Sequence, residues 1–314
     1  MKDDEMRTLV EICRLYYIHG FSQQQIAAHF YISRPQVSKL LSKAKKMNIV
    51  TININDPFAE ERIAALDLEK YYPLDDAIVV DTEGRTYDEA FAAIAHNVSL
   101  AFTPCVSGSR IGVSSGFTVS ACSRHTVIYN CRDLTFIPLV GGESPEGKNW
   151  YANENCRRFS NRFNGKYMVL NTPMVIRDGE VRRQICLDSA VKPVLDSYGQ
   201  LDVLLLGIGE LDKESTLGRW SPFSVEELAD LYDQGIRAMF GASFVDADGN
   251  EAFPEKGDLM IGIKVPQIKR CKTVIGVAIG EKKKEAIRAV LKGGLVNIIC
   301  TDLKTAHLLT EKTE

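Results

Sequence analysis

Residues 273–302 read TVIGVAIGEKKKEAIRAVLKGGLVNIICTD, and this stretch decides the fold class. The apolar run 273–278 predicts a buried strand, residues 282–292 have the spacing of an amphipathic helix, and a second apolar run covers 297–301. Strands that alternate with helices in this way favour a mostly parallel sheet with helices on both faces. The sequence therefore predicts an α/β domain.

The same alternation extends back to residue 76. Further strands are predicted at 77–80, 110–114, 134–140, 167–171 and 203–208. Further helices are predicted at 85–102, 118–125, 149–161, 181–197, 225–232 and 303–309. Ligands of such sheets bind at the carboxyl ends of the strands, near helix N-termini.

Three of the predicted strands end in glycines, and the first passes into a helix through the sequence GVSSGFT. Small residues let the backbone approach a ligand, and free N–H groups at a helix start favour a phosphate. Glycine also ends many strands for turn geometry alone, so the pocket rests on all three together. The predicted anion-binding residues are Ser114, Ser115, Gly116, Phe117, Thr118, Gly141, Gly142, Gly207 and Gly209.

Two further motifs allow two interpretations each. The lysines at 282–284 follow a strand and can face an anion or solvent, with solvent favoured on the motif alone. The segment DADGN at 246–250 resembles part of a calcium loop, but position 257 is glycine where the closing glutamate belongs. A hairpin turn is the better interpretation. We expect no metal site and no cofactor.

Charge divides the chain. Residues 1–50 carry eight Lys/Arg and four Asp/Glu, a net +4, which leaves 30 basic and 37 acidic residues, a net −7, for 51–314. A basic head on an acidic body indicates that the head meets an anion that the body does not. No apolar run is long enough to span a bilayer, and the acidic N-terminus is no secretory signal. Eight scattered cysteines fit reduced thiols, so we expect a cytoplasmic protein without membrane association.

The head is predicted to be a winged helix-turn-helix. Helices are expected at 6–18, 22–30 and 34–47, and a strand at 49–54 as the wing. The pairs Ser22/Gln25 and Ser33/Gln36 are capping boxes, in which each side chain satisfies a free backbone donor of the other residue. The expected domains are 1–55 for DNA binding, 56–75 for a linker helix and 76–314 for an effector. The linker helix packs on its copy in a dimer or on its own body, with the former slightly favoured.

The outward face of the third helix contains no acid and fits the major groove. Arginine can bind guanine, glutamine can bind adenine, and lysine can bind phosphate. A basic helix can also be a solvated face or a protein-docking surface, but geometry and charge sign together favour DNA. The predicted DNA-binding residues are Ser33, Arg34, Gln36, Ser38, Lys39, Ser42 and Lys43.

The GVSSG segment also satisfies the nucleophile-elbow pattern GxSxG. A hydrolase would need a downstream acid and histidine. Only His307 allows that order, with Asp302 five residues before it, and a helix carrying both is a poor geometry for a catalytic base. We predict no catalytic residues of this class.

Nearly the whole chain resembles the SorC/DeoR-like bacterial transcription regulators that carry a sugar-binding domain. GFSQQQIA at 20–27 and ISRPQVSKLL at 32–41 are similar to their helix-turn-helix, and residues 111–118 to their GxSxGxT loop. Residues 203–209, 244–249 and above all 273–309 are similar to later family segments. The resemblance implies the fold of ribose-phosphate isomerase and glucosamine-phosphate deaminase, without their catalysis.

The resemblance also implies a phosphorylated sugar or similar small metabolite as effector, operator DNA as partner, and a homo-oligomer, dimer or tetramer. It adds Lys283 and Asp246 to the effector site, although a turn role for Asp246 is equally compatible. Some members form an imine through a lysine where this chain has Val140, so we expect no covalent adduct. Met239 and Ile279 also depart from the family pattern, which indicates an unusual effector specificity.

The expected function is therefore a transcriptional regulator whose affinity for double-stranded operator DNA responds to the metabolite. The alternative is a sugar-phosphate isomerase or deaminase with a DNA-binding appendage. Such an enzyme needs a general base at the glycine loops, where the acids are Glu143 and Glu210.

Overall fold

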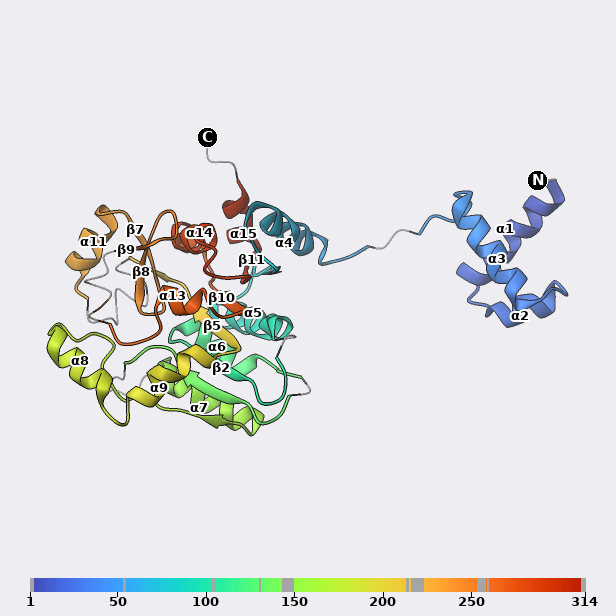
Figure 1. Cartoon of the computed structure of the whole chain (residues 1–314). Helices are drawn as coiled ribbons and strands as arrows, with labels where there is room; N and C mark the ends of the chain where they lie inside the picture. Colours follow the sequence, from blue (N-terminus) through green and yellow to red (C-terminus); the bar gives the residue numbers. More distant parts are fainter. Residues whose placement is uncertain are drawn as a thin grey trace. The chain divides into compact units, whose positions relative to one another are not determined.

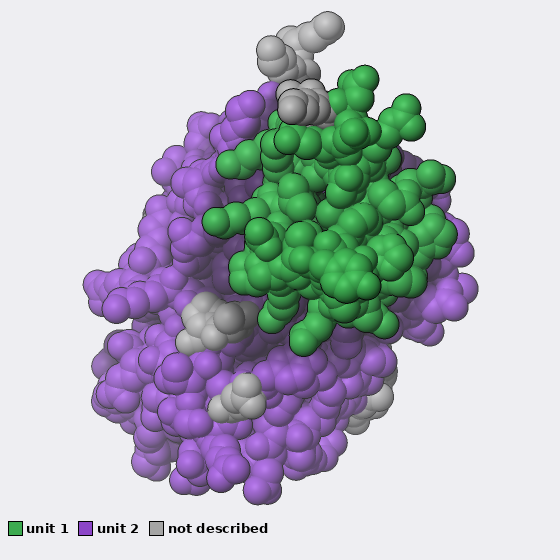
Figure 2. All heavy atoms as spheres, turned by 90° about the vertical axis from the view of Figure 1, so that its right-hand side faces the viewer, with its two compact units in different colours: residues 1–57 green, residues 58–314 purple. Residues whose placement is uncertain are grey.

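A computed structural model describes residues 3–52, 55–102, 105–129, 131–142, 150–212, 215, 223–252, 258 and 260–311. The chain divides into two compact units, residues 1–57 and residues 58–314, coloured separately in Figure 2. Each unit has its own apolar core and is described by itself below, first the head and then the body.

The head consists of helices α1 (Asp3–Tyr17), α2 (Gln23–His29) and α3 (Arg34–Lys46). Both predicted capping boxes are present, so Ser22 with Gln25 and Ser33 with Gln36 start the second and third helices. The three helices bury one small core, made of Leu9, Ile12, Cys13, Ile26, Ala27, Val37, Leu41 and Ala44. The spacing of these residues along each helix gives the amphipathic pattern seen in the sequence.

The predicted wing strand is not formed in the part of 49–54 that the structure describes. Ile49 and Val50 instead pack against the three-helix core, and residues 51–52 have no regular structure. Residues 53 and 54 lie outside the described residues. A strand needs a partner for its backbone groups, and the described part of the head contains no other strand to pair with.

The body is built on a seven-stranded sheet whose neighbours all pair in parallel, in the order β1-β11-β10-β5-β2-β3-β4. Figure 1 labels β11, β10, β5 and β2 of this sheet. This confirms the predicted α/β class. Six of the seven predicted strands are present with small shifts at their ends, whereas β4 overlaps the predicted strand 167–171 at Tyr167 alone. Their bounds are β1 Asp76–Val80, β2 Arg110–Val113, β3 Thr135–Pro138, β4 Lys166–Tyr167, β5 Val203–Gly207, β10 Thr273–Val277 and β11 Ile298–Asp302.

Helices cover both faces of this sheet, so alternate residues of one strand enter two different cores. Val203 and Leu205 of β5 pack with α5 (Tyr87–Ala101), α6 (Phe117–His125) and α7 (Ala152–Phe163). Leu204 and Leu206 pack on the opposite side with α4 (Ala59–Tyr71), α9 (Lys192–Asp196), α14 (Lys284–Lys292) and α15 (Leu303–Thr310). Burial on both faces explains why the strands read as continuous apolar runs.

A second sheet was not predicted. It is antiparallel, in the order β6-β7-β8-β9, with β6 Gly209–Glu210, β7 Ile236–Phe240, β8 Ser243–Asp246 and β9 Glu251–Ala252. Within the described residues of the body, the remaining regular elements are α8 Gly179–Leu187, η1 Ser197–Gln200, α11 Val225–Asp233, α13 Val265–Ile268 and η2 Glu281–Lys283. Two of the strands are only two residues long, too short to give an alternating pattern.

Helix α4 belongs to the body. It buries Ala64, Ala65 and Leu68 in the core shared with β1, α14 and α15. From the sequence, packing of this helix on its copy in a dimer is slightly favoured. That prediction is wrong for the buried face of α4, which packs on the body of its own chain. Within the described residues, no helix combines the length and the apolar character that crossing a membrane requires.

Candidate functional site

A cavity of about 1110 Å³ opens at the carboxyl ends of the parallel strands. The cavity lies at the boundary between the neighbouring strands β5 and β2. Along the chain, the next strand of this sheet after β2 is β3, on one side of the boundary, and the next after β5 is β10, on the other side. Such a switch point leaves a crevice, because the segments after the two strands leave on opposite sides. The predicted residues that line the cavity are Ser114, Ser115, Gly116, Phe117, Thr118, Gly141, Gly142, Gly207, Gly209 and Lys283.

The N-terminus of α6 is the strongest anion-binding feature of this cavity. Gly116 is the N-cap with φ +124°, a conformation that favours glycine, and no side chain caps the helix. The first amides of the helix, at Phe117 and Thr118, therefore keep free N–H groups at the positive end of the helix dipole. The amide of Gly116 itself is occupied, because it donates to the carbonyl of Trp150 at 2.9 Å.

The amides of Gly141, Gly142 and Gly207 are also occupied, so fewer amides are available to an anion than predicted. Gly141 donates to the carbonyl of Ile261 and Gly142 to that of Thr172, at 2.9 and 2.8 Å. A side chain at Gly141 would lie 2.8 Å from the Thr172 carbonyl oxygen, so this glycine serves close backbone packing. The amide of Gly207 donates to the hydroxyl of Ser114 at 3.0 Å, which ties β5 to the α6 loop.

The ammonium group of Lys283 and the carboxylate of Glu210 lie close together in the lining of the cavity. Lys283 donates from Nζ to the carbonyl of Ile208 at 2.8 Å, and its Nζ lies 4.0 Å from Oε2 of Glu210. Burial lowers the pKa of Lys283, an effect that the nearby Glu210 opposes. Burial also raises the pKa of Glu210, with Lys283 opposing. Glu210 Oε2 is buried and has no hydrogen-bond partner among the described residues, so a donor from a ligand would satisfy it.

Asp246 does not reach this cavity. Its carboxylate accepts hydrogen bonds from the amides of Asp248 and Asn250, both at 2.9 Å, and so closes the turn between β8 and β9. These backbone bonds hold the pKa of Asp246 below its ordinary value against the effect of burial. The structure therefore favours the turn role. The other acid considered at the glycine loops, Glu143, lies outside the described residues.

Several cavity residues gave no signal in the sequence. They are aromatic or apolar side chains from separate segments, among them Tyr87, Phe91, Trp150, Tyr151, Met174 and Val175. The three positions that depart from the family pattern, Val140, Met239 and Ile279, line the same cavity. An apolar residue on a helix or loop is more often part of a core than of a site, so only the tertiary structure identifies this group.

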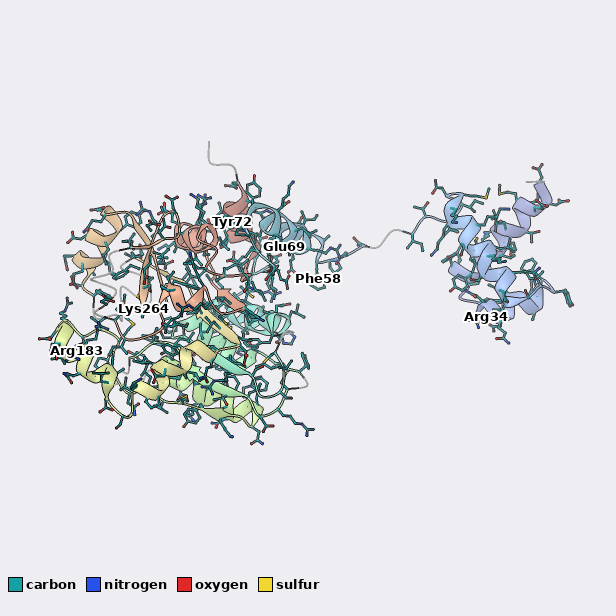
Figure 3. The ribbon with its side chains drawn as sticks, viewed as in Figure 1. Arg34, Phe58, Glu69, Tyr72, Arg183 and Lys264 are labelled. Carbon is teal, nitrogen blue, oxygen red and sulfur yellow. The ribbon has the colours of Figure 1, made fainter. Side chains whose placement is uncertain are left out.

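In the head, all seven predicted DNA-binding residues are exposed on α3 and its N-cap. Figure 3 labels Arg34 at the start of this helix. Ser38, Lys39, Ser42, Lys43 and Lys46 line one shallow depression. Gln36 is less available than predicted, because its Oε1 accepts from the amide and the hydroxyl of Ser33 at 2.7 and 2.9 Å. It therefore cannot offer both its acceptor and its donor to adenine while it caps the helix.

Comparisons with known proteins agree with this arrangement. A family model described as "Putative sugar-binding domain" matches residues 54–311. The deoxyribonucleoside regulator of Bacillus subtilis (strain 168) is 30% identical over 314 residues, 98% of this chain and 99% of that protein. The sorbitol operon regulator of Klebsiella pneumoniae is 26% identical over 311 residues, 98% of each chain. The crystal structure of the full-length sorbitol operon regulator SorC from Klebsiella pneumoniae has a TM-score of 0.75, at 25% identity, over 99% of this chain and 100% of that one.

Proposed function

The chain belongs to the family of SorC- and DeoR-type transcriptional regulators with a sugar-binding domain, and from this membership we propose that a phosphorylated sugar or related metabolite in the cavity controls operator binding by the head. The observation that carries the proposal is the uncapped N-terminus of α6, which opens into the cavity. Free amides at a helix start are the usual protein site for a phosphate group.

The position of Lys283 supports a ligand with both charge and hydroxyl groups. Its ammonium group adds positive charge to the wall that the phosphate would face. Glu210 offers a buried acceptor to a sugar hydroxyl. The described cysteines are free thiols, which fits a regulator that works in the reducing cytoplasm where DNA is found.

A chain of contacts connects the cavity to α4, the helix that begins the body and follows the head. The amide of Gly280, which lines the cavity, donates to Asp302 Oδ2 at 2.8 Å. Asp302 also caps α15 by accepting from the amide and hydroxyl of Thr305 at 2.9 and 2.7 Å. A ligand that moves the loop at 280–283 therefore acts directly on the start of α15.

Helix α15 in turn holds α4. Tyr72 lies just after α4 and is labelled in Figure 3. Its hydroxyl donates to the carbonyl of Leu309 in α15 at 2.9 Å. Two carboxylates of α4 also accept hydrogen bonds from backbone amides in or next to β1. Glu69 accepts from the amide of Ala77 at 3.2 Å, and Glu61 accepts from the amide of Asp81 at 2.7 Å. We infer that the effector is coupled to the head through α15 and α4, by favouring one arrangement of these helices over another.

We further propose a homo-oligomer, dimer or tetramer. The buried face of α4 packs on the body, but Ile63 and Leu66 on its opposite side, and Phe58 and Tyr71 at its two ends, are each at least half exposed. Exposed apolar side chains gathered on one element are a feature of interaction surfaces. A helix-turn-helix dimer also matches the two-fold symmetry of typical operators.

The test selects an operator from a random double-stranded DNA library and measures its affinity by fluorescence anisotropy. Log affinity should fall steeply with log salt, by a slope of about 0.9 for each phosphate contact. Addition of a sugar phosphate that stabilises the protein in a thermal-shift screen should change the affinity. A head that selects no DNA sequence would overturn the proposal.

The enzyme remains the second candidate because of Glu210. A buried carboxylate with a raised pKa in a ligand cavity is what a general base requires. Isomerisation or deamination of sugar phosphates by the pure protein, abolished by Glu210→Gln, would establish it. If phosphorylated ligands bind to the protein but are not converted, the enzyme hypothesis is excluded and the regulator hypothesis is retained.

A further inference from the structure

The cavity is larger than a sugar phosphate requires. Pockets for drug-sized ligands span about 300–1,000 Å³, and this one holds about 1110 Å³. A sugar phosphate that occupies the α6 N-terminus and reaches Glu210 would fill only part of that volume. The remaining space must accommodate either water or a second part of the ligand.

Aromatic rings line that space with exposed surface. The side chains of Tyr87 and Phe117 are 80% and 44% exposed, although both line the cavity. The Trp150 ring, which also lines the cavity, lies 5.7 Å from the Phe117 ring and stacks on Tyr151 at 4.2 Å and 24°. A planar ring of a ligand would cover this surface and remove it from water.

The lining also contains polar residues such as Ser215, Glu281 and Lys282, but part of it favours a ring over a second sugar. Val140, Met239 and Ile279 line the cavity with apolar side chains that offer no hydrogen bond to hydroxyl groups. The hydroxyls of a second sugar would gain no hydrogen bond from these three side chains. A flat ring has two apolar faces and places its polar atoms only at its edge.

We propose that the effector carries a planar ring in addition to its sugar and phosphate, as a nucleoside 5′-monophosphate does. The phosphate binds the N-terminus of α6, a sugar hydroxyl donates to Glu210, and the ring stacks on Tyr87 and Phe117. This inference rests on the proposed function, because it specifies the ligand class of the same effector cavity.

The experiment compares matched probes by isothermal titration calorimetry on the full chain. Ribose 5-phosphate and adenosine 5′-monophosphate share sugar and phosphate and differ by the ring, whereas trehalose 6-phosphate adds bulk without a planar ring. Stacking of a base on an aromatic side chain corresponds to roughly 5- to 150-fold in affinity. The nucleotide should therefore bind at least about tenfold more tightly than ribose 5-phosphate.

Variants test whether the gain comes from the exposed rings. Tyr87→Leu and Phe117→Leu should each reduce the advantage of the nucleotide by about fivefold or more. Tyr87→Leu, which is outside the phosphate site, should also leave ribose 5-phosphate binding within about twofold. Tyr129→Leu is the matched control, because Tyr129 is 65% exposed and does not line the cavity. It should change neither affinity.

The possible outcomes separate this inference from the proposed function. The planar-ring proposal is wrong if ribose 5-phosphate or trehalose 6-phosphate binds as tightly as the nucleotide. It is also wrong if the nucleotide keeps its higher affinity in both leucine variants. In either case the proposal of a phosphorylated effector is retained. If none of the phosphorylated probes binds, both proposals fail. If the nucleotide binds as predicted but leaves DNA affinity unchanged, the ring stands and the proposed regulation fails.

Discussion

Ser115 lies directly before the N-cap of α6, so its side chain is the best place to test the phosphate. It lines the cavity and is half-buried, with space around the neighbouring Gly116. A carboxylate there would repel a dianion held by the first amides of the helix. Ser115→Glu should weaken sugar-phosphate binding by at least about tenfold, which corresponds to 1.4 kcal/mol.

The control measurement for Ser115→Glu is the DNA affinity without ligand. It should stay within about twofold of the wild-type value, because the coupling free energy of about 1–3 kcal/mol acts only when ligand is bound. Calorimetry with the sugar phosphate and anisotropy with the selected operator give both values on one preparation. Unchanged ligand affinity would rule out the α6 N-terminus as the phosphate site.

Glu210 makes stability depend on pH with a known sign. Burial raises its pKa in the folded protein above the ordinary value of 4.5, so the folded state binds the proton more tightly than the unfolded chain. This contribution to stability is present below the unfolded pKa and is lost as pH rises through the folded pKa. The Tm of Glu210→Gln relative to the wild type should therefore increase between about pH 4 and pH 7.

Thermal unfolding across that pH range is the measurement, and 1 kcal/mol corresponds to a shift of about 2–4 °C in Tm. Glu311→Gln serves as the control, because Glu311 is exposed at the end of α15. A Tm difference for Glu210→Gln that is independent of pH would show that the carboxylate has no raised pKa in the folded state.

At the scale of elements, α3 is the predicted DNA-reading helix. Lys39 and Lys43 are exposed on it, one turn apart, beside the same shallow depression. Loss of one phosphate contact lowers the salt slope by about 0.9. Lys39→Ala and Lys43→Ala should therefore each weaken binding to every DNA sequence and lower that slope by about 1.

Salt titrations of operator binding check this, with Lys269→Ala as a control of equal charge change on an exposed site of the body. A slope that matches the wild type in both α3 variants would mean that these lysines meet no phosphate. The head would then be a protein-docking module, the alternative that its basic helix leaves open.

The contact between α15 and α4 gives the second prediction at this scale. Tyr72→Phe removes the hydrogen bond to Leu309 but keeps the ring, at a cost of about 1 kcal/mol. Ligand affinity should change little, whereas the ratio of operator affinities with and without ligand should approach one. Tyr129→Phe is the control, because Tyr129 is exposed and does not line the cavity. Equal ratios in both variants would exclude this contact as a route of coupling.

The elements that the sequence predicted well have strong local signals. The strands of the parallel sheet other than the exposed β4 contain apolar runs because they are buried on both faces. Ser33 with Gln36 marks the start of α3 by the chemistry of the capping box. In the second sheet, β6 and β9 have two residues each, too few to show a pattern. The alternating burial of β7 over Ile236–Phe240 is a signal that the prediction missed. The wing was predicted from apolar residues at 49 and 50 that pack on the helical core.

The site was predictable where backbone chemistry defines it. Free amides at a helix start follow from the glycine before α6, whereas the capture of the Gly141 and Gly142 amides by Ile261 and Thr172 depends on segments far along the chain. The aromatic lining was equally hidden, because Tyr87 and Trp150 come together only in the folded body. Long-range packing, rather than local propensity, decides both features.

For the whole molecule, the account requires that one ligand-binding event and one DNA-binding event share a coupling free energy. The head holds the basic helix and the body holds the cavity, and within the body α4 and α15 are the elements that link the cavity to the start of the body. Thermodynamic linkage then demands reciprocity: ligand must change operator affinity by the same factor by which operator changes ligand affinity.

The most direct test of this central claim measures both factors on the full chain, by operator titration at saturating ligand and ligand titration at saturating operator. We predict equal factors in the range of about 5- to 150-fold. If the ligand binds in the cavity at saturation and the operator affinity stays unchanged, ligand binding and DNA binding are not coupled, which contradicts the proposed regulation.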